Sequence, residues 1–95
     1  MAAYVYIMAS KRNGTIYIGV TSDLRKRVYE HKQGIFEGFS EQYDCKNLIW
    51  YETHDEILTA IQREKTMKHW VRKWKLDLIE KTNPQWSDLY ETLSW

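Results

Sequence analysis

Two alternating apolar segments joined by an Asn-Gly pair constrain this fold more than any other feature of the sequence. AYVYIMA and TIYIGV each alternate two sets of side chains, and Asn13-Gly14 lies between them. Asn-Gly between such segments is the strongest short-range signal for a β-hairpin. A loop with an even number of residues places Tyr6 and Tyr17 on one face of the sheet. A four-residue loop over 10–13 would place them directly opposite each other.

A helix is predicted directly after the hairpin, over TSDLRKRVYEHKQG. Thr21 or Ser22 can cap its first turn, and Asp23 suits the positive end of the helix dipole. Gly34 is expected to end the helix.

One stripe of this helix mixes apolar and polar side chains at i, i+3, i+4 and i+7: Leu24, Arg27, Val28 and His31. A snorkelling arginine and a hydrogen-bonded core histidine would explain the two polar residues separately. A cross-strand tyrosine pair is also usually a packing contact. Together, Arg27 and His31 beside two tyrosines favour a phosphate-binding active site.

The second half of the chain predicts a third strand, CKNLIWYET, and a helix, DEILTAIQREKTMKHW, opened by a capping box between Thr53 and Glu56. The inward stripe of this helix is expected to contain Ile57, Ala60, Ile61, Glu64 and Met67 or Lys68. A carboxylate on an apolar stripe needs a partner. Glu64 therefore either forms a salt bridge, with Arg27 or a lysine, or binds a hard cation such as Mg²⁺.

A further amphipathic helix, VRKWKLDLIEKTNP, is predicted to end at Asn83-Pro84. Its inner side is expected to carry Val71, Trp74, Leu78 and Ile79. The tail QWSDLYETLSW predicts a short final helix capped by Ser87, with three apolar residues packed inward: Trp86, Leu89 and Leu93. The fold class is thus α/β, a small sandwich with a three-stranded, largely antiparallel sheet flanked by helices.

Composition limits the classes of protein that are possible. A chain of 95 residues with 43% hydrophobic content suits one domain, over residues 1–95. The lone Cys45 excludes an internal disulfide and a cysteine-based zinc site. The apolar start MAAYVYIMAS is too short to span a bilayer and has no preceding basic segment. We therefore expect a cytoplasmic protein without a membrane segment.

The charge distribution is more informative than the net charge of +1. Residues 37–56 are mainly acidic, and residues 34–44 read as a polar loop. Residues 63–75 contain a single acidic residue and these six basic ones: Arg63, Lys65, Lys68, Arg72, Lys73 and Lys75. They form a candidate nucleic-acid-binding surface. A solvated helix face is the alternative reading.

In order along the chain, these motifs resemble the GIY-YIG nuclease domain, in particular its small, free-standing bacterial branch. The resemblance is carried by YVYIMASKRNGTIYIGVTSDLRKRVYEH, by REKTMKHWVRKWKLDLI and by NPQWSDL. The second tripeptide is present as Tyr17-Ile18-Gly19. The first departs from the family pattern, because Tyr4-Val5-Tyr6 replaces Gly-Ile-Tyr, but its last tyrosine is kept as Tyr6.

The resemblance implies a metal-dependent endonuclease that hydrolyses DNA phosphodiester bonds, with repair or recombination as the pathway that analogy suggests. By matching positions, Glu64 would hold Mg²⁺ or Mn²⁺, and Tyr17 would act as general base. A free phenol has a pKa near 10, so the site must favour its anion. Tyr6 would orient the base or the water, Arg27 would clamp the phosphate, and His31 would position the water or relay its proton.

Two further positions match the motif as supporting residues. Gly19 would allow close backbone approach, and Asn83 would support the site or cap a helix end. A second class of function stays open, namely a weak or inactive module that binds nucleic acid or a protein. A protein partner would then supply the DNA affinity that a single small domain lacks. A structural role in a repair complex, with exposed tryptophans as anchors, is a third reading.

Overall fold

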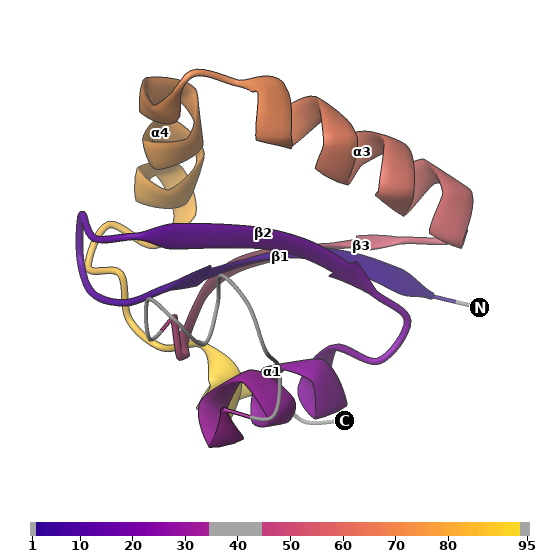
Figure 1. Cartoon of the computed structure of the whole chain (residues 1–95), viewed down its shortest axis with the longest axis horizontal. Coiled ribbons are helices and arrows are strands. Elements are labelled where there is room, and N and C mark those ends of the chain that lie inside the picture. The colour runs from indigo at the N-terminus through magenta and orange to yellow at the C-terminus, as the bar shows by residue number, and fades with distance from the viewer. Residues whose placement is uncertain (1, 35–44, 94–95) are drawn as a thin grey trace.

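The computed structural model contains one three-stranded sheet with helices on both faces, and it describes residues 2–34 and 45–93 (Figure 1). The strands are β1 (Ala3–Ala9), β2 (Ile16–Thr21) and β3 (Asn47–His54). The helices are α1 (Leu24–Gln33), α3 (Ile57–His69), α4 (Arg72–Thr82) and a 3-10 turn, η1 (Tyr90–Thr92). The strand order is β2-β1-β3, and both pairings are antiparallel. The predicted fold class is confirmed.

The hairpin between β1 and β2 has a longer loop than the expected one. Ala9 pairs with Ile16, so residues 10–15 form the loop. The loop is closed by a hydrogen bond from the Ser10 amide to the Thr15 carbonyl at 3.0 Å. Tyr6 therefore faces Gly19, and Tyr17 faces Met8. The predicted shared face of the two tyrosines is correct, but their direct pairing is wrong, since the even-numbered loop is two residues longer than expected.

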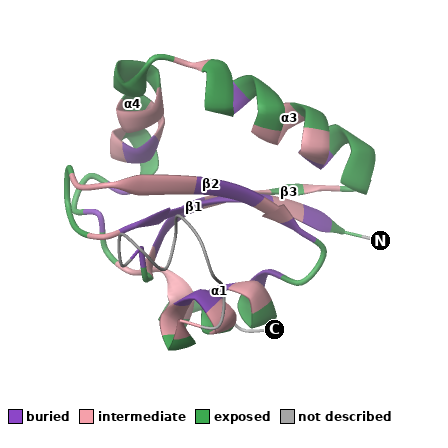
Figure 2. Ribbon diagram, viewed as in Figure 1, coloured by how far each residue is buried: buried purple, intermediate pink, exposed green. Residues whose placement is uncertain are grey.

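Two apolar cores lie on opposite faces of the sheet. Helices α3 and α4 cover one face, and α1 covers the other, with the C-terminal segment beside it (Figure 1). Val5 and Ile7 of β1 belong to the first core, and Tyr6 and Met8 belong to the second. Figure 2 shows the buried residues concentrated in the sheet and on the helix sides that face it. β1 is apolar on both faces because it is the central strand.

The N-terminus of α1 differs from the expected cap. The Asp23 carboxylate accepts a hydrogen bond from the Lys26 amide at 3.2 Å, so Asp23 is the cap instead of Thr21 or Ser22. The Thr21 hydroxyl accepts from the Asp23 amide at 3.0 Å and so shapes the turn before the helix. Gly34 ends the helix as predicted, with a left-handed φ of 67°. The predicted polar loop falls mainly on residues 35–44, outside the described residues.

The start of α3 also corrects the sequence-based expectation. Thr53 pairs with Tyr4 within the sheet, so it forms no capping box, and Glu56 precedes the helix without a side-chain cap. Ile57 is 43% exposed and does not join the inward stripe, whereas Ala60 and Met67 are buried.

Helix α4 and the tail differ from the prediction in which side chains face the core. Val71 and Trp74 are exposed, and Ile79 is the buried residue of the helix. The predicted break at Asn83-Pro84 is present, because α4 ends at Thr82. Trp86 and Leu93 are buried and Leu89 is partly buried, but the final helix is only the turn η1, preceded by Leu89 and not by Ser87. None of the described helices combines the length and apolar character needed to cross a membrane.

Candidate active site

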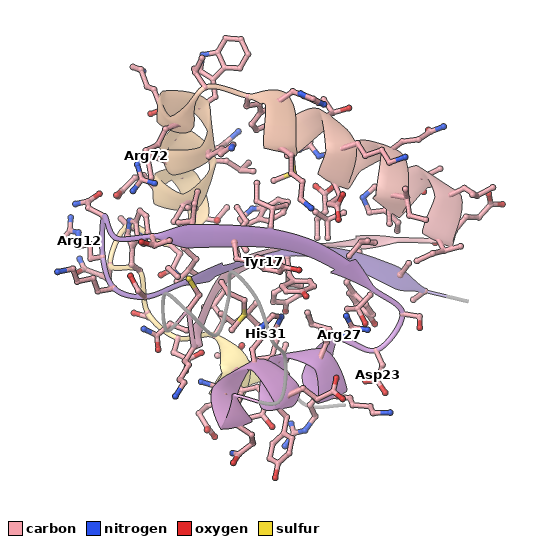
Figure 3. The ribbon with its side chains drawn as sticks, in the orientation of Figure 1. Arg12, Tyr17, Asp23, Arg27, His31 and Arg72 are labelled. Atoms are coloured by element: carbon pink, nitrogen blue, oxygen red, sulfur yellow. The ribbon has the colours of Figure 1, made fainter. Side chains whose placement is uncertain are left out.

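Three aromatic side chains meet between the sheet and α1. The Tyr6 hydroxyl lies 3.0 Å from His31 Nε2, in a buried hydrogen bond between β1 and α1. The Tyr17 ring lies 5.3 Å from the His31 ring and 6.4 Å from the Tyr6 ring, measured between centroids. Figure 3 shows Tyr17 on β2 and His31 on α1 pointing toward one another, with Arg27 in the same layer. The structure thus brings together four of the five predicted catalytic residues.

Gly19 makes room for the Tyr6 ring. A Cβ atom at position 19 would lie 2.5 Å from both Cζ and Oη of Tyr6. That distance is below any normal non-bonded contact, so every other residue would displace the phenol. The glycine of the Tyr17-Ile18-Gly19 motif therefore permits close approach of a side chain, where the sequence predicted close approach of backbone.

Tyr6 and His31 form a neutral pair at neutral pH. Burial raises the pKa of the Tyr6 phenol well above its usual value, and the neighbouring Tyr17 raises it further. Burial, together with the charge of Arg27, lowers the pKa of His31 to about 4. Tyr6 therefore keeps its hydroxyl proton, and His31 is an uncharged imidazole that resists protonation.

Arg27 supplies the positive charge of this layer. Its guanidinium lowers the pKa of His31 and opposes the rise in the pKa of Tyr6, so it acts on both members of the pair. It also forms an ion pair of 3.6 Å with Glu30, and its side chain is 40% exposed. The arginine thus reaches from the buried pair to solvent, as expected of a residue at the rim of an anion site.

Glu64, the fifth predicted catalytic residue, lies on α3, which covers the opposite face of the sheet from α1. Its side chain is 14% exposed and pairs with Lys68 at 3.4 Å, which is the lysine salt bridge expected as one explanation for this carboxylate. The charge of Glu64 contributes to the raised pKa of Tyr6. Lys68 Nζ lies 6.0 Å from the centroid of the Tyr17 ring. Sequence reasoning placed Lys68 in a basic surface and missed its position over Tyr17, which depends on how α3 packs against the sheet.

The donor set suits a metal site with a single carboxylate. No group of three or more His, Cys, Asp or Glu side chains that could hold a metal occurs in residues 2–34 and 45–93. Mg²⁺ is commonly held by one or two carboxylates, with waters and substrate phosphates completing its shell. Glu64, as an oxygen donor that is still partly exposed, fits this type of site and does not fit a site enclosed by protein ligands.

Asn83 joins the end of α4 to β3. Its buried amide donates to the carbonyls of Ile49 and Ser87, both at 2.9 Å, and its oxygen accepts from the Ser87 amide at 3.1 Å. All of these partners are backbone groups. Of the two roles expected for Asn83, the geometry therefore favours a structural role at the end of α4 over support of the site.

The six predicted nucleic-acid-binding residues differ in their contacts. Arg63 pairs with Glu52 at 3.0 Å, and Lys73 pairs with Asp77 at 3.0 Å. Lys65 is exposed on α3. The other three residues lie along β2 and its loop: Lys68, Arg72 and Lys75.

Comparisons with known proteins show which family this chain resembles. Residues 2–77 match the model of the GIY-YIG catalytic domain. A UPF0213 protein of Staphylococcus saprophyticus is 32% identical over 76 residues, which cover 80% of this chain and 92% of the relative. A UPF0213 protein of Haloquadratum walsbyi is 31% identical over 77 residues, 81% of this chain and 85% of the relative. The solution NMR structure of a UPF0213 protein from Bacillus halodurans shares the fold, with a TM-score of 0.58 at 24% identity over 99% of this chain and 98% of that one. The chain belongs to the GIY-YIG catalytic domain family.

Proposed function

We propose that this chain is a divalent-metal-dependent endonuclease that hydrolyses phosphodiester bonds of DNA. The observation that carries the proposal is the buried hydrogen bond between Tyr6 and His31, directly beside the Tyr17 ring. A purely structural core has no need for a hydrogen-bonded phenol and imidazole next to a second phenol and an arginine. Family membership supports the same class of reaction.

Tyr17 is the proposed general base, and Tyr6 and His31 position it. Because Tyr6 keeps its proton, it is unsuited to remove one from water and instead orients its neighbours by hydrogen bonding. His31 is held neutral, and its ring lies 5.7 Å from the Tyr6 ring and 5.3 Å from the Tyr17 ring, so it orients the two phenols and is not the acceptor of the water proton. Lys68 places a positive charge over the Tyr17 ring, where the anion of the base would form.

Arg27 and Glu64 act on the phosphate. Arg27 carries a planar guanidinium at the rim, which is suited to two oxygens of one phosphate. Glu64 would hold Mg²⁺ or Mn²⁺ and would give up its ion pair with Lys68 to do so. When bound, such an ion supplies Lewis-acid stabilisation of the charge that develops on the phosphate and on the leaving oxygen.

Cleavage of labelled duplex, flap and four-way-junction DNA at low salt tests this proposal. Each substrate is incubated with Mg²⁺, with Mn²⁺ or with EDTA, and Glu64→Gln, prepared in parallel, controls for contaminating nucleases. We expect cleavage that needs the metal and is lost in the variant. Salt-sensitive binding without cleavage of any substrate would refute the endonuclease and favour a binding module.

A further inference from the structure

Two shallow depressions meet along the outer side of β2. The first, about 270 Å³, is lined by Tyr17, its neighbours in β2 and two lysines, Lys68 and Lys75. The second, about 510 Å³, is lined by residues 13–16, Arg72 and again Lys75. Since the two share Ile16 and Lys75, they form one continuous groove from Tyr17 to the hairpin loop, which we call the β2 groove.

All charged residues that line the β2 groove, among those the structure describes, are basic: Lys68, Arg72 and Lys75. Arg72 donates to the carbonyls of Asn13 and Gly14, at 3.2 and 2.6 Å. Figure 3 shows Arg72 on α4 beside the loop that carries Arg12.

Arg72 and Lys75 keep their charge available, whereas Lys68 forms an ion pair with Glu64 at 3.4 Å. Arg72 is held by backbone carbonyls, and Lys75 Nζ donates to the Lys68 carbonyl at 3.4 Å. Carbonyl groups position a cation without neutralising it. Lys73, in contrast, lies on the same helix and forms an ion pair with a carboxylate. The β2 groove therefore carries two cations held by backbone carbonyls, and a third cation, Lys68, is paired with Glu64 beside the proposed catalytic base.

The length of the groove suits a nucleic-acid backbone. From Tyr17 to Gly14 the chain extends at most about 10 Å. One strand of B-DNA places a phosphate every ~3.4 Å along the helix axis, and neighbouring phosphates are farther apart along the strand itself, so this length holds at most about three phosphates. We propose that the β2 groove binds the phosphates of the substrate strand next to the scissile bond, on the side of Tyr17 that leads to the hairpin loop. This inference rests on the proposed function, because it identifies which part of the substrate the groove binds.

The salt dependence of DNA binding tests the groove separately from catalysis. Binding of a short labelled duplex is measured by fluorescence anisotropy in EDTA, over a series of salt concentrations. Lys75→Gln removes one groove charge, and Lys81→Gln removes one exposed charge of the same helix outside the groove. We expect Lys75→Gln to weaken binding and to lower the slope of log affinity against log salt by about 0.9. Lys81→Gln should leave both quantities unchanged, and Lys75→Arg should restore the wild-type slope.

Equal losses of DNA affinity in the Lys75→Gln and Lys81→Gln variants, or no loss in either, would refute the proposal that the β2 groove binds DNA. Thermal unfolding of each variant checks that it is folded. The two proposals fail in different ways. If the wild-type protein binds DNA through Lys75 but never cleaves it with Mg²⁺ or Mn²⁺, the endonuclease proposal is refuted and the groove proposal is supported. If the wild-type protein cleaves DNA but Lys75→Gln leaves the slope of log affinity against log salt unchanged, the groove proposal is refuted and the endonuclease proposal is supported.

Discussion

Acidification should destabilise the folded chain through His31. The pKa of this buried imidazole is about 4 in the folded chain, and its ordinary value is 6.5. Between these values the unfolded chain binds a proton at this position and the folded chain does not. The free energy of unfolding therefore falls as the pH drops through this window, and the His31 contribution levels off below it. A difference of roughly 2.5 pKa units, at 1.36 kcal/mol each, corresponds to about 3 kcal/mol.

Urea unfolding at neutral pH and near pH 4 measures this loss in the wild type and in His31→Gln. Glutamine offers an amide to Tyr6 but does not titrate, and the other titrating groups are common to both proteins. We expect the wild type to lose about 3 kcal/mol more than the variant across this range. Equal losses in the two proteins would show that His31 is not held neutral by burial, and would refute the neutral pair with Tyr6.

Three other predictions use the same unfolding assay at neutral pH. Gly19→Ala should cost about 1–3 kcal/mol, because the added methyl group overlaps the Tyr6 ring; an unchanged stability would mean that the ring has room to move. Asn83→Ala should cost about 2 kcal/mol or more, since it leaves buried backbone groups without partners; a neutral effect would contradict the structural role. Glu64→Gln should change stability by less than about 0.5 kcal/mol, because its ion pair with Lys68 lies at i,i+4 and is partly exposed; a large loss would make Glu64 a structural residue.

Periodicity predicted the strands and helices of this fold well. Local turn and cap signals were less successful in predicting the length of the hairpin loop and the helix starts. Alternation identified β1 and β2, and Asn13-Gly14 identified their turn, but that pair does not fix how many flanking residues join the loop. Thr53 carried a valid capping signal, and sheet pairing with Tyr4 overrode it. Helical spacing predicts which residues share a face of a helix, but not how much of that face other elements cover. Trp74 lies on the predicted inner side of α4 and is nevertheless exposed.

Sequence patterns predicted which candidate-site residues share one face of the sheet or of a helix. They did not predict the contacts that depend on how the helices pack against the sheet. The parity of the hairpin put Tyr6 and Tyr17 on one side of the sheet, and the helical spacing put His31 on a stripe that faces them. The contact of Lys68 with Tyr17 depends on how α3 crosses the sheet, which no local pattern contains. The separation of Lys75 from Lys73 likewise depends on the docking of α4.

The rate constant for single-turnover DNA cleavage by Tyr17→Phe tests the central claim most directly. Tyr29→Phe is the matched control, since Tyr29 is a half-exposed tyrosine on α1. If Tyr17 is the general base, its loss should slow cleavage by about 100-fold or more, and Tyr29→Phe should cleave like the wild type. Cleavage by Tyr17→Phe at the wild-type rate would contradict the assignment of the base.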